Sequence, residues 1–227
     1  MNIGSHDAAR MERSAAILKE EGVPYNQYLP PVTESEAKLK TPEEIAQRLF
    51  AVYGVCVHSE MLGSGMTRKD SKTYLKKIDD ILGGRLKGSL SPEERAFLKL
   101  KKPDQLSIAK FGWRYECCHV LMWALGMTDE LDCPDQICDV SAMGEIIWRQ
   151  ESLKGFLERT KPRTRDEIMD AADLTLRYDW ACVDARIKQQ EPPAYLNDEV
   201  VVERHYAFNW LIGAYGDAGW DDISTDT

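Results

Sequence analysis

Apolar residues recur at three- and four-residue spacing along most of the chain, which is the pattern of amphipathic α-helices. Ile45, Leu49 and Val52, for example, fall on one helical face. The ambiguous stretch DEVVVERHYAFNWL is long and starts at Asn197, which favours a helix over a strand. We therefore expect one all-α domain, residues 1–227, built as a bundle of about eight helices. The expected ranges are 10–21, 42–62, 68–82, 92–101, 104–125, 140–159 (broken near Glu151), 165–190 and 198–215.

Several helix starts carry a capping signal. Residues 41–44 (TPEE) and 91–94 (SPEE) combine an N-cap hydroxyl, a proline at the first helical position and a glutamate that can complete a capping box. Thr164 opens a similar box, and Thr67 a weaker one. Gly126 falls where a C-terminal cap is expected. These signals fix where the predicted helices begin and end.

Three segments lie outside the helical pattern. Residues 1–12 are expected to be flexible or an expression scar. The proline-rich segment 23–31 predicts an irregular, extended stretch across the surface, with Tyr25 and Tyr28 among its anchors. Residues 217–227 form an acidic tail.

Charge is unevenly distributed along the chain, whose net charge is −9. Residues 1–110 hold 18 Lys/Arg and 15 Asp/Glu, a balance of +3, whereas residues 111–227 hold 11 and 23, a balance of −12. An acidic half repels phosphate, so nucleic-acid binding is not expected. The longest apolar run, Val120–Leu125, is far shorter than the ~20 residues that cross a bilayer, so no membrane contact is expected.

The cysteines indicate a reducing compartment. Four of the six lie in apolar helical stretches: Cys56, Cys117, Cys118 and Cys182. That placement is typical of buried free thiols, and it favours a cytoplasmic protein. Cys133 and Cys138 could pair or hold a metal, but no second ligand pair with zinc-site spacing lies nearby. We therefore expect neither a metal nor a cofactor.

Three segments, one in each of three predicted helices, mix aromatic and aliphatic residues with charges: 113–126, 173–187 and 200–216. The first is apolar almost all round, so its polar residues need partners on other helices. The candidate site residues are Arg114, Glu116, His119, Asp173, Arg177, Asp184, Glu203, Arg204, His205 and Asn209.

These residues allow two interpretations. In the first, which we favour, they form a buried ion-pair network that fixes the packing of the helices. Arg114 and Glu116 are two residues apart, so they should point to different helices. Glu116 would meet Arg177 or Arg204, and Arg114 would meet Glu203 or an aspartate at 173 or 184. In the second interpretation, the same groups line a pocket and titrate abnormally.

One short motif suggests a metal but lacks its partner. Glu116 and His119 match the Glu-x-x-His ligand pair of di-iron bundles, which needs a second copy on another helix. Residues 203–205 (ERH) are not that copy, because the histidine lies two residues from the glutamate.

Several separated segments resemble one family. They are RSAAILKEEGVPYNQYLP, WRYECCHVLMWALG, RYDWACVDAR, ERHYAFNWL and the terminal WDDISTDT. Together they span residues 13–227, and they resemble the bacterial proteins grouped as domain of unknown function 4272. The resemblance implies a bacterial, cytoplasmic protein and transfers no activity. It also implies that the following polar residues belong together: Arg114, Glu116, Arg177, Glu203, Arg204, His205, Asn209 and the aspartates of the tail.

Two functions from different classes fit this sequence. The first is a non-enzymatic binding or regulatory protein, of the toxin-neutralising kind, that engages a basic protein partner through its acidic half. The alternative is a hydrolase that uses Glu116, Glu203 and His205 as acid and base groups, with an arginine (Arg114, Arg177 or Arg204) holding an anionic substrate. Exposure separates the two, because an open cleft favours the enzyme and a sealed, paired cluster favours the binding protein.

Overall fold

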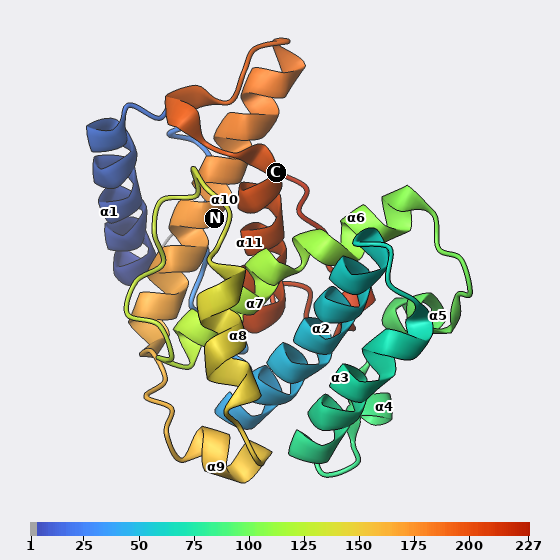
Figure 1. The fold of residues 1–227 in the computed structure, drawn as a ribbon. Coiled ribbons are helices and arrows are strands. Elements are labelled where there is room, and N and C mark those ends of the chain that lie inside the picture. Colours follow the sequence, from blue (N-terminus) through green and yellow to red (C-terminus); the bar gives the residue numbers. More distant parts are fainter. Residues whose placement is uncertain (1–3) are drawn as a thin grey trace.

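The computed structural model describes residues 4–227, and within this range it consists of helices and irregular segments, with no strand (Figure 1). This confirms the all-α fold class. In chain order the helices are α1 (Ser5–Glu21), α2 (Pro42–Gly63), α3 (Arg68–Ile81), α4 (Leu86–Ser89), α5 (Pro92–Lys99), α6 (Gln105–Trp113), α7 (Tyr115–Ala124), α8 (Val140–Trp148), α9 (Leu153–Leu157), α10 (Arg165–Ile187) and α11 (Asp198–Leu211). Two short 3-10 turns, η1 (Pro193–Tyr195) and η2 (Trp220–Asp222), follow α10 and α11.

The predicted capping boxes are present. The hydroxyls of Thr41, Ser91 and Thr164 each accept the backbone N–H of the glutamate three residues later, at 3.2 to 3.3 Å. At the start of α3, the Asp70 carboxylate accepts the N–H of Thr67 at 2.7 Å. The expected break within 140–159 is also present, because α8 ends before α9 begins. Helix α4 was not predicted, since four residues are too few to show a period.

The predicted helix 104–125 is two helices rather than one. Helix α6 ends at Trp113 and α7 begins at Tyr115, with Arg114 between them at φ −60° and ψ −6°. Both helices pack against α2. The turn at Arg114 changes the direction of the chain between these two contacts. Every residue of α7 except His119 is buried, which is the central position expected for this segment.

The core surrounds α2 and α7. Helix α2 packs against α3, α6 and α7, while α11 packs against both α7 and α10 (Figure 1). The predicted core residues of α7 are buried, with 0 % exposure for Val120 and Leu121 and 8 % for Trp123. A smaller apolar cluster joins α1, α10 and α11 through Leu18 and Val201, among others. Charged residues of α11 therefore meet partners on α7 and, separately, on α10 inside the molecule.

The proline-rich segment is extended as expected, but its anchors differ. Tyr25 and Tyr28 are 40 % and 83 % exposed, so the prediction that they anchor the segment was wrong. Val23 and Pro31 are buried instead. An Asn26 side chain accepts the N–H of Tyr28 at 2.9 Å, and this local turn leaves the tyrosine ring in solvent.

Both ends of the described chain pack onto the body. Helix α1 begins at Ser5, earlier than the expected start at residue 10, and Arg10 within it is 1 % exposed. Residues 5–12 are therefore helical rather than flexible, and residues 1–3 lie outside the described range. Near the other end, Trp220 and Ile223 of the acidic tail are buried at 6 % and 9 % exposure.

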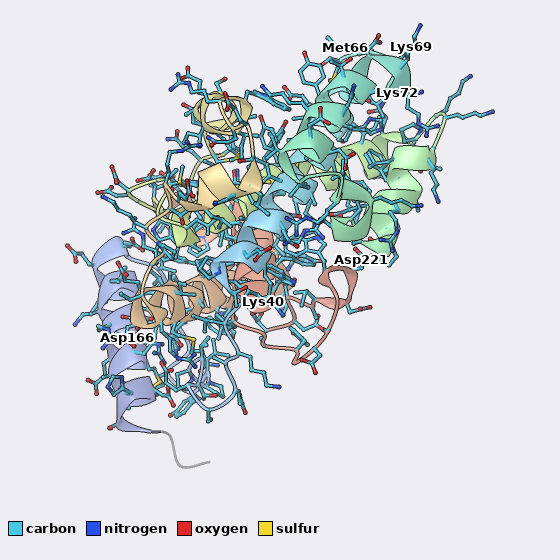
Figure 2. The ribbon with its side chains drawn as sticks, turned by 90° about the horizontal axis from the view of Figure 1, so that it is seen from below. Lys40, Met66, Lys69, Lys72, Asp166 and Asp221 are labelled. Atoms are coloured by element: carbon cyan, nitrogen blue, oxygen red, sulfur yellow. The ribbon has the colours of Figure 1, made fainter. Side chains whose placement is uncertain are left out.

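The lysines of α3 occupy a different end of the molecule from α1. Figure 2 shows Met66, Lys69 and Lys72 at one end and Asp166 near α1 at the other. Lys69 and Lys72 are exposed, in agreement with a solvated helix face. Between residues 4 and 227, no helix is both long and apolar enough to cross a membrane.

Candidate functional site: an acidic loop held by buried ion pairs

The predicted polar residues form several separate clusters rather than one network. Three of these clusters include a residue of α11. Its partner lies at the α6–α7 turn in the first cluster, on α7 in the second and on α10 in the last. The cluster around Glu116 and Arg204 meets a large cavity.

The first cluster lies at the turn between α6 and α7. Arg114 Nη1 donates to Glu203 Oε2 at 2.9 Å, and the guanidinium lies 3.6 Å from the centre of the Tyr206 ring. The Cys117 thiol donates to the same carboxylate at 3.2 Å. Burial, and then the Glu203 charge, raise the pKa of Cys117 well above its ordinary value, so the thiol stays protonated. This cluster is suited to holding helices together rather than to nucleophilic chemistry.

The second cluster joins α7, α11 and the loop that follows α7. Glu116 Oε1 accepts the backbone N–H of Cys138 at 2.6 Å, and its Oε2 accepts Arg204 Nε at 3.2 Å. Arg204 also donates, through Nη1, to the carbonyl of Asp132 at 2.5 Å. Glu116 and Arg204 are 2 % and 3 % exposed, so both charges are compensated inside the protein. The pairing of Glu116 with Arg204 was one of the two expected from the sequence.

One expectation about these two clusters was wrong. Arg114 and Glu116 do not reach different helices, because Glu203 and Arg204 are neighbours on α11. The expectation assumed that residues 114 and 116 lie on one continuous helix. Arg114 instead lies at the turn before α7, where the angular spacing of a helix does not apply.

Residues 128–139, which we call the acidic loop, are held through their backbone. Besides the contacts of Glu116 and Arg204, the Arg163 guanidinium donates to the carbonyls of Thr128 (3.0 Å) and Asp129. The N–H of Asn197 donates to the carbonyl of Pro134 at 2.8 Å. The loop therefore has no regular secondary structure but is fixed at its start, middle and end.

The acidic side chains of this loop face solvent. Its five acidic residues are all exposed: Asp129, Glu130, Asp132, Asp135 and Asp139. Residues 127–148 contain no lysine or arginine. Ile137 is 65 % exposed in the same loop. The loop thus presents a strongly negative surface with one apolar side chain.

A cavity of about 750 Å³, which we call the loop cavity, opens beside this loop. All five acidic residues of the loop contribute to its wall, and His119, Cys138 and Arg204 line it from the protein side. The Nδ1 atom of His119 is buried and has no hydrogen-bond partner among the described residues. Burial, and then the charge of Arg204, lower the pKa of His119, so its neutral form is favoured.

Two of the three candidates on α10, Asp173 and Arg177, lie in a third cluster that faces α1. Arg177 binds Asp173 of its own helix through two hydrogen bonds, at 2.9 and 3.1 Å. Asp173 also accepts Ser14 Oγ at 2.6 Å and the N–H of Val32 at 3.0 Å. This pair therefore ties α10 to α1 and the proline-rich segment, and it takes no part in the network around Glu116.

Arg10 forms a further cluster that sequence analysis missed. Its guanidinium binds Asp7, Asp170 and Glu34, at 3.0, 3.1 and 2.5 Å. Two of its partners, Glu34 and Asp170, lie 24 and 160 positions away, and the third, Asp7, lies in the segment that was expected to be flexible.

A last cluster ties the tail to α11. His205 Nδ1 lies 3.0 Å from Asp179 Oδ2, and its Nε2 lies 3.0 Å from the Asn209 amide. Asn209 donates to the carbonyl of Ser224 at 2.9 Å. Asp184 belongs to none of these clusters, since it binds Lys188 at 2.6 Å in a partly exposed pair.

The structure also brings together three groups that the sequence did not connect. Glu116, His119 and Cys138 each offer one donor atom, and these atoms lie within 4.8 Å of one another. Glu116 and His119 were paired by their spacing, but Cys138 reaches them only because the acidic loop folds back onto α7.

Comparison with known proteins gives one finding. No curated protein and no solved structure matches the chain. A family model described as domain of unknown function (DUF4272) matches residues 10–223, in agreement with the resemblance carried by the separated motifs. The chain therefore belongs to the DUF4272 family.

Proposed function

We propose that this protein binds a basic protein partner through the acidic loop and the loop cavity, as a regulatory or toxin-neutralising protein would. The observation that carries the proposal is the gathering of five exposed carboxylates around one cavity. The single arginine on the cavity wall, Arg204, is paired with Glu116. A lysine or arginine side chain of a partner would therefore meet a negative field in a concave site.

The buried ion pairs support this role by holding the loop in place before binding. Arg204 and Arg163 bind loop carbonyls, and Glu116 binds a loop N–H. A loop that is already ordered loses less conformational entropy on binding, which favours affinity. Ile137 adds exposed apolar area at the same surface, and such a contact complements charge in an interface.

The hydrolase alternative has less support. Its proposed acid and base groups Glu116 and His205 are both 2 % exposed and are hydrogen-bonded to protein partners. Glu203 is bound to Arg114 and to the thiol of Cys117. Groups that are sealed and mutually paired favour the binding protein over the enzyme.

The proposal also concerns the compartment. All six cysteines, which lie in the described range, are free, and five of them are buried. Free thiols fit a reducing environment, so we place the protein in a bacterial cytoplasm. We do not propose a nucleic-acid partner, because the acidic loop would repel phosphate.

An oligoarginine peptide tests the proposal directly. We expect saturable binding to the full chain by isothermal titration calorimetry, with an affinity that falls as salt is added. The test variant replaces Asp129, Asp132 and Asp135 by Asn and Glu130 by Gln. These changes leave the backbone contacts of the loop in place, and we expect the affinity to fall at least about tenfold.

A matched control removes the same amount of charge elsewhere. It replaces Glu12, Glu20, Glu151 and Glu191, which are all exposed and lie outside the loop, by Gln. Both variants have four fewer negative charges, so their net charge is equal. Equal affinities in the two variants, or no saturable binding by the unmodified chain, would exclude the acidic loop as the binding surface.

A further inference from the structure

The donors of Glu116, His119 and Cys138 form a set that suits a divalent transition metal. A carboxylate oxygen, an imidazole nitrogen and a thiol sulfur are the ligand types that Zn²⁺ takes in proteins. The three donor atoms lie within 4.8 Å of one another. Around a tetrahedral zinc ion they would be about 3.3 to 3.6 Å apart, from metal–ligand distances near 2.0 to 2.3 Å. A shift of about 1 Å in the side chains therefore closes the site.

The groups around these donors are arranged as the outer shell of a metal site. Both oxygens of Glu116 already accept a hydrogen bond, one from the N–H of Cys138 and one from Arg204. Hydrogen bonds of this kind orient a ligating carboxylate and leave it a lone pair for the metal. The first of them also fixes the backbone of Cys138 beside the carboxylate.

His119 supplies an independent indication. It is the one residue of α7 that is not buried, yet its Nδ1 atom is sealed from solvent and has no hydrogen-bond partner within residues 4–227. A buried polar atom without a partner carries a cost that a native structure normally avoids. A metal ion that accepts the lone pair of this nitrogen would remove that cost.

The three donors border two cavities. His119 and Cys138 line the loop cavity, and Glu116 lines a second cavity of about 340 Å³ that Cys138 also borders. The three donors thus lie in the wall between the two cavities. The carboxylates of the acidic loop line the same cavity as His119 and Cys138, and they favour a cation there.

We propose that Glu116, His119 and Cys138 bind one zinc-type divalent metal ion, with a fourth coordination position open to the loop cavity. When the metal–sulfur bond forms, the thiol proton of Cys138 leaves to solvent, and no electron is transferred. Three protein ligands with an open position leave room for water or for a donor group from a bound partner. The proposal departs from the expectation of no metal, which rested on sequence spacing alone.

Cobalt(II) provides the test, because a cobalt–thiolate bond gives a charge-transfer absorption band. The full chain is freed of metal with a chelator and titrated with cobalt(II), and zinc is then added in competition. We expect one equivalent to bind, with the thiolate band, and zinc to displace it. Cys138→Ser should abolish the band, and His119→Gln should weaken binding at least about tenfold. Cys133→Ser, a change in the same loop, should keep the band.

The melting temperature of each metal-free variant shows that it is folded before titration. The proposal is overturned if the unmodified chain shows no saturable binding, or if the band survives Cys138→Ser. It is also overturned if Cys133→Ser removes the band. The metal site does not rest on the peptide-binding proposal, because the four-carboxylate loop variant keeps all three donors and should keep the band. Either proposal can therefore fail while the other stands.

Discussion

Replacing Glu116 by alanine removes the acceptor that joins three parts of the molecule. In the folded protein this carboxylate binds Arg204 of α11 and the N–H of Cys138 in the acidic loop. Arg204 is 3 % exposed, so in the variant its guanidinium stays buried without its carboxylate partner. Although Arg204 borders the loop cavity, so little of it is exposed that water replaces the lost carboxylate poorly. The charge cannot be neutralised either, since arginine keeps its proton.

The expected cost follows from that burial. Removing one partner of a buried ion pair costs about 3–5 kcal/mol of unfolding free energy, and the lost acceptor for the loop N–H is part of the same change. For a chain of this size, 1 kcal/mol shifts the melting temperature by about 2–4 °C, so we expect a drop of about 6–20 °C. Glu145→Ala is the control. Its pair with Arg149 is 70 % and 75 % exposed and should contribute less than about 1 kcal/mol.

Thermal and urea unfolding, followed by circular dichroism, measure both variants. If Glu116→Ala lowers the melting temperature by no more than Glu145→Ala does, the pair does not hold the fold. In that case water must reach Arg204, and the cluster would have to be understood as an open site.

Three further predictions follow from other parts of the structure. Trp123→Ala should cost about 3–5 kcal/mol in urea unfolding, because the ring is 8 % exposed; a loss below about 1 kcal/mol would place α7 at the periphery. Gly126→Ala should destabilise far more than Gly83→Ala: both have φ of +64°, but only at Gly126 would the new Cβ meet the carbonyl oxygen of Lys161, at 2.0 Å. Equal melting temperatures would refute this. Burial lowers the pKa of His58 to about 4 from 6.5. As the pH falls, the histidine is therefore protonated in the unfolded state before it is protonated in the folded state. Stability present above pH 6.5 should fall by up to about 3 kcal/mol as the pH falls towards 4, and a His58→Gln variant should lack this part of the pH dependence.

The features that were predicted from sequence are local in the chain. The hydroxyl of Thr41 and the glutamate that completes its capping box are three residues apart, so the contact can be read from sequence. The central position of α7 was also predicted, because its apolar run leaves no polar face. The turn at Arg114 was not predicted, since no proline marks it and the apolar pattern continues through it.

The features that were missed depend on distant contacts. Glu116 and Cys138 are 22 positions apart, and their contact depends on how the acidic loop folds back onto α7. The loop residues between them have no period that would predict that path. Asp179 was missed as the partner of His205 because the two residues lie far apart in the chain, on α10 and α11. His205 itself was a candidate. Charge composition indicated an acidic half, but it could not show that five acids gather around one cavity.

Hydrogen exchange of the backbone amides in the acidic loop tests the central claim most directly. That claim is that the Glu116–Arg204 pair holds the loop in one conformation. In the unmodified chain the Cys138 amide, bonded to a buried carboxylate at 2.6 Å, should exchange slowly. In Glu116→Ala it should exchange much faster, under conditions where the amides of α2 remain protected. An acidic loop that exchanges as fast in the unmodified chain as in the variant would contradict the account.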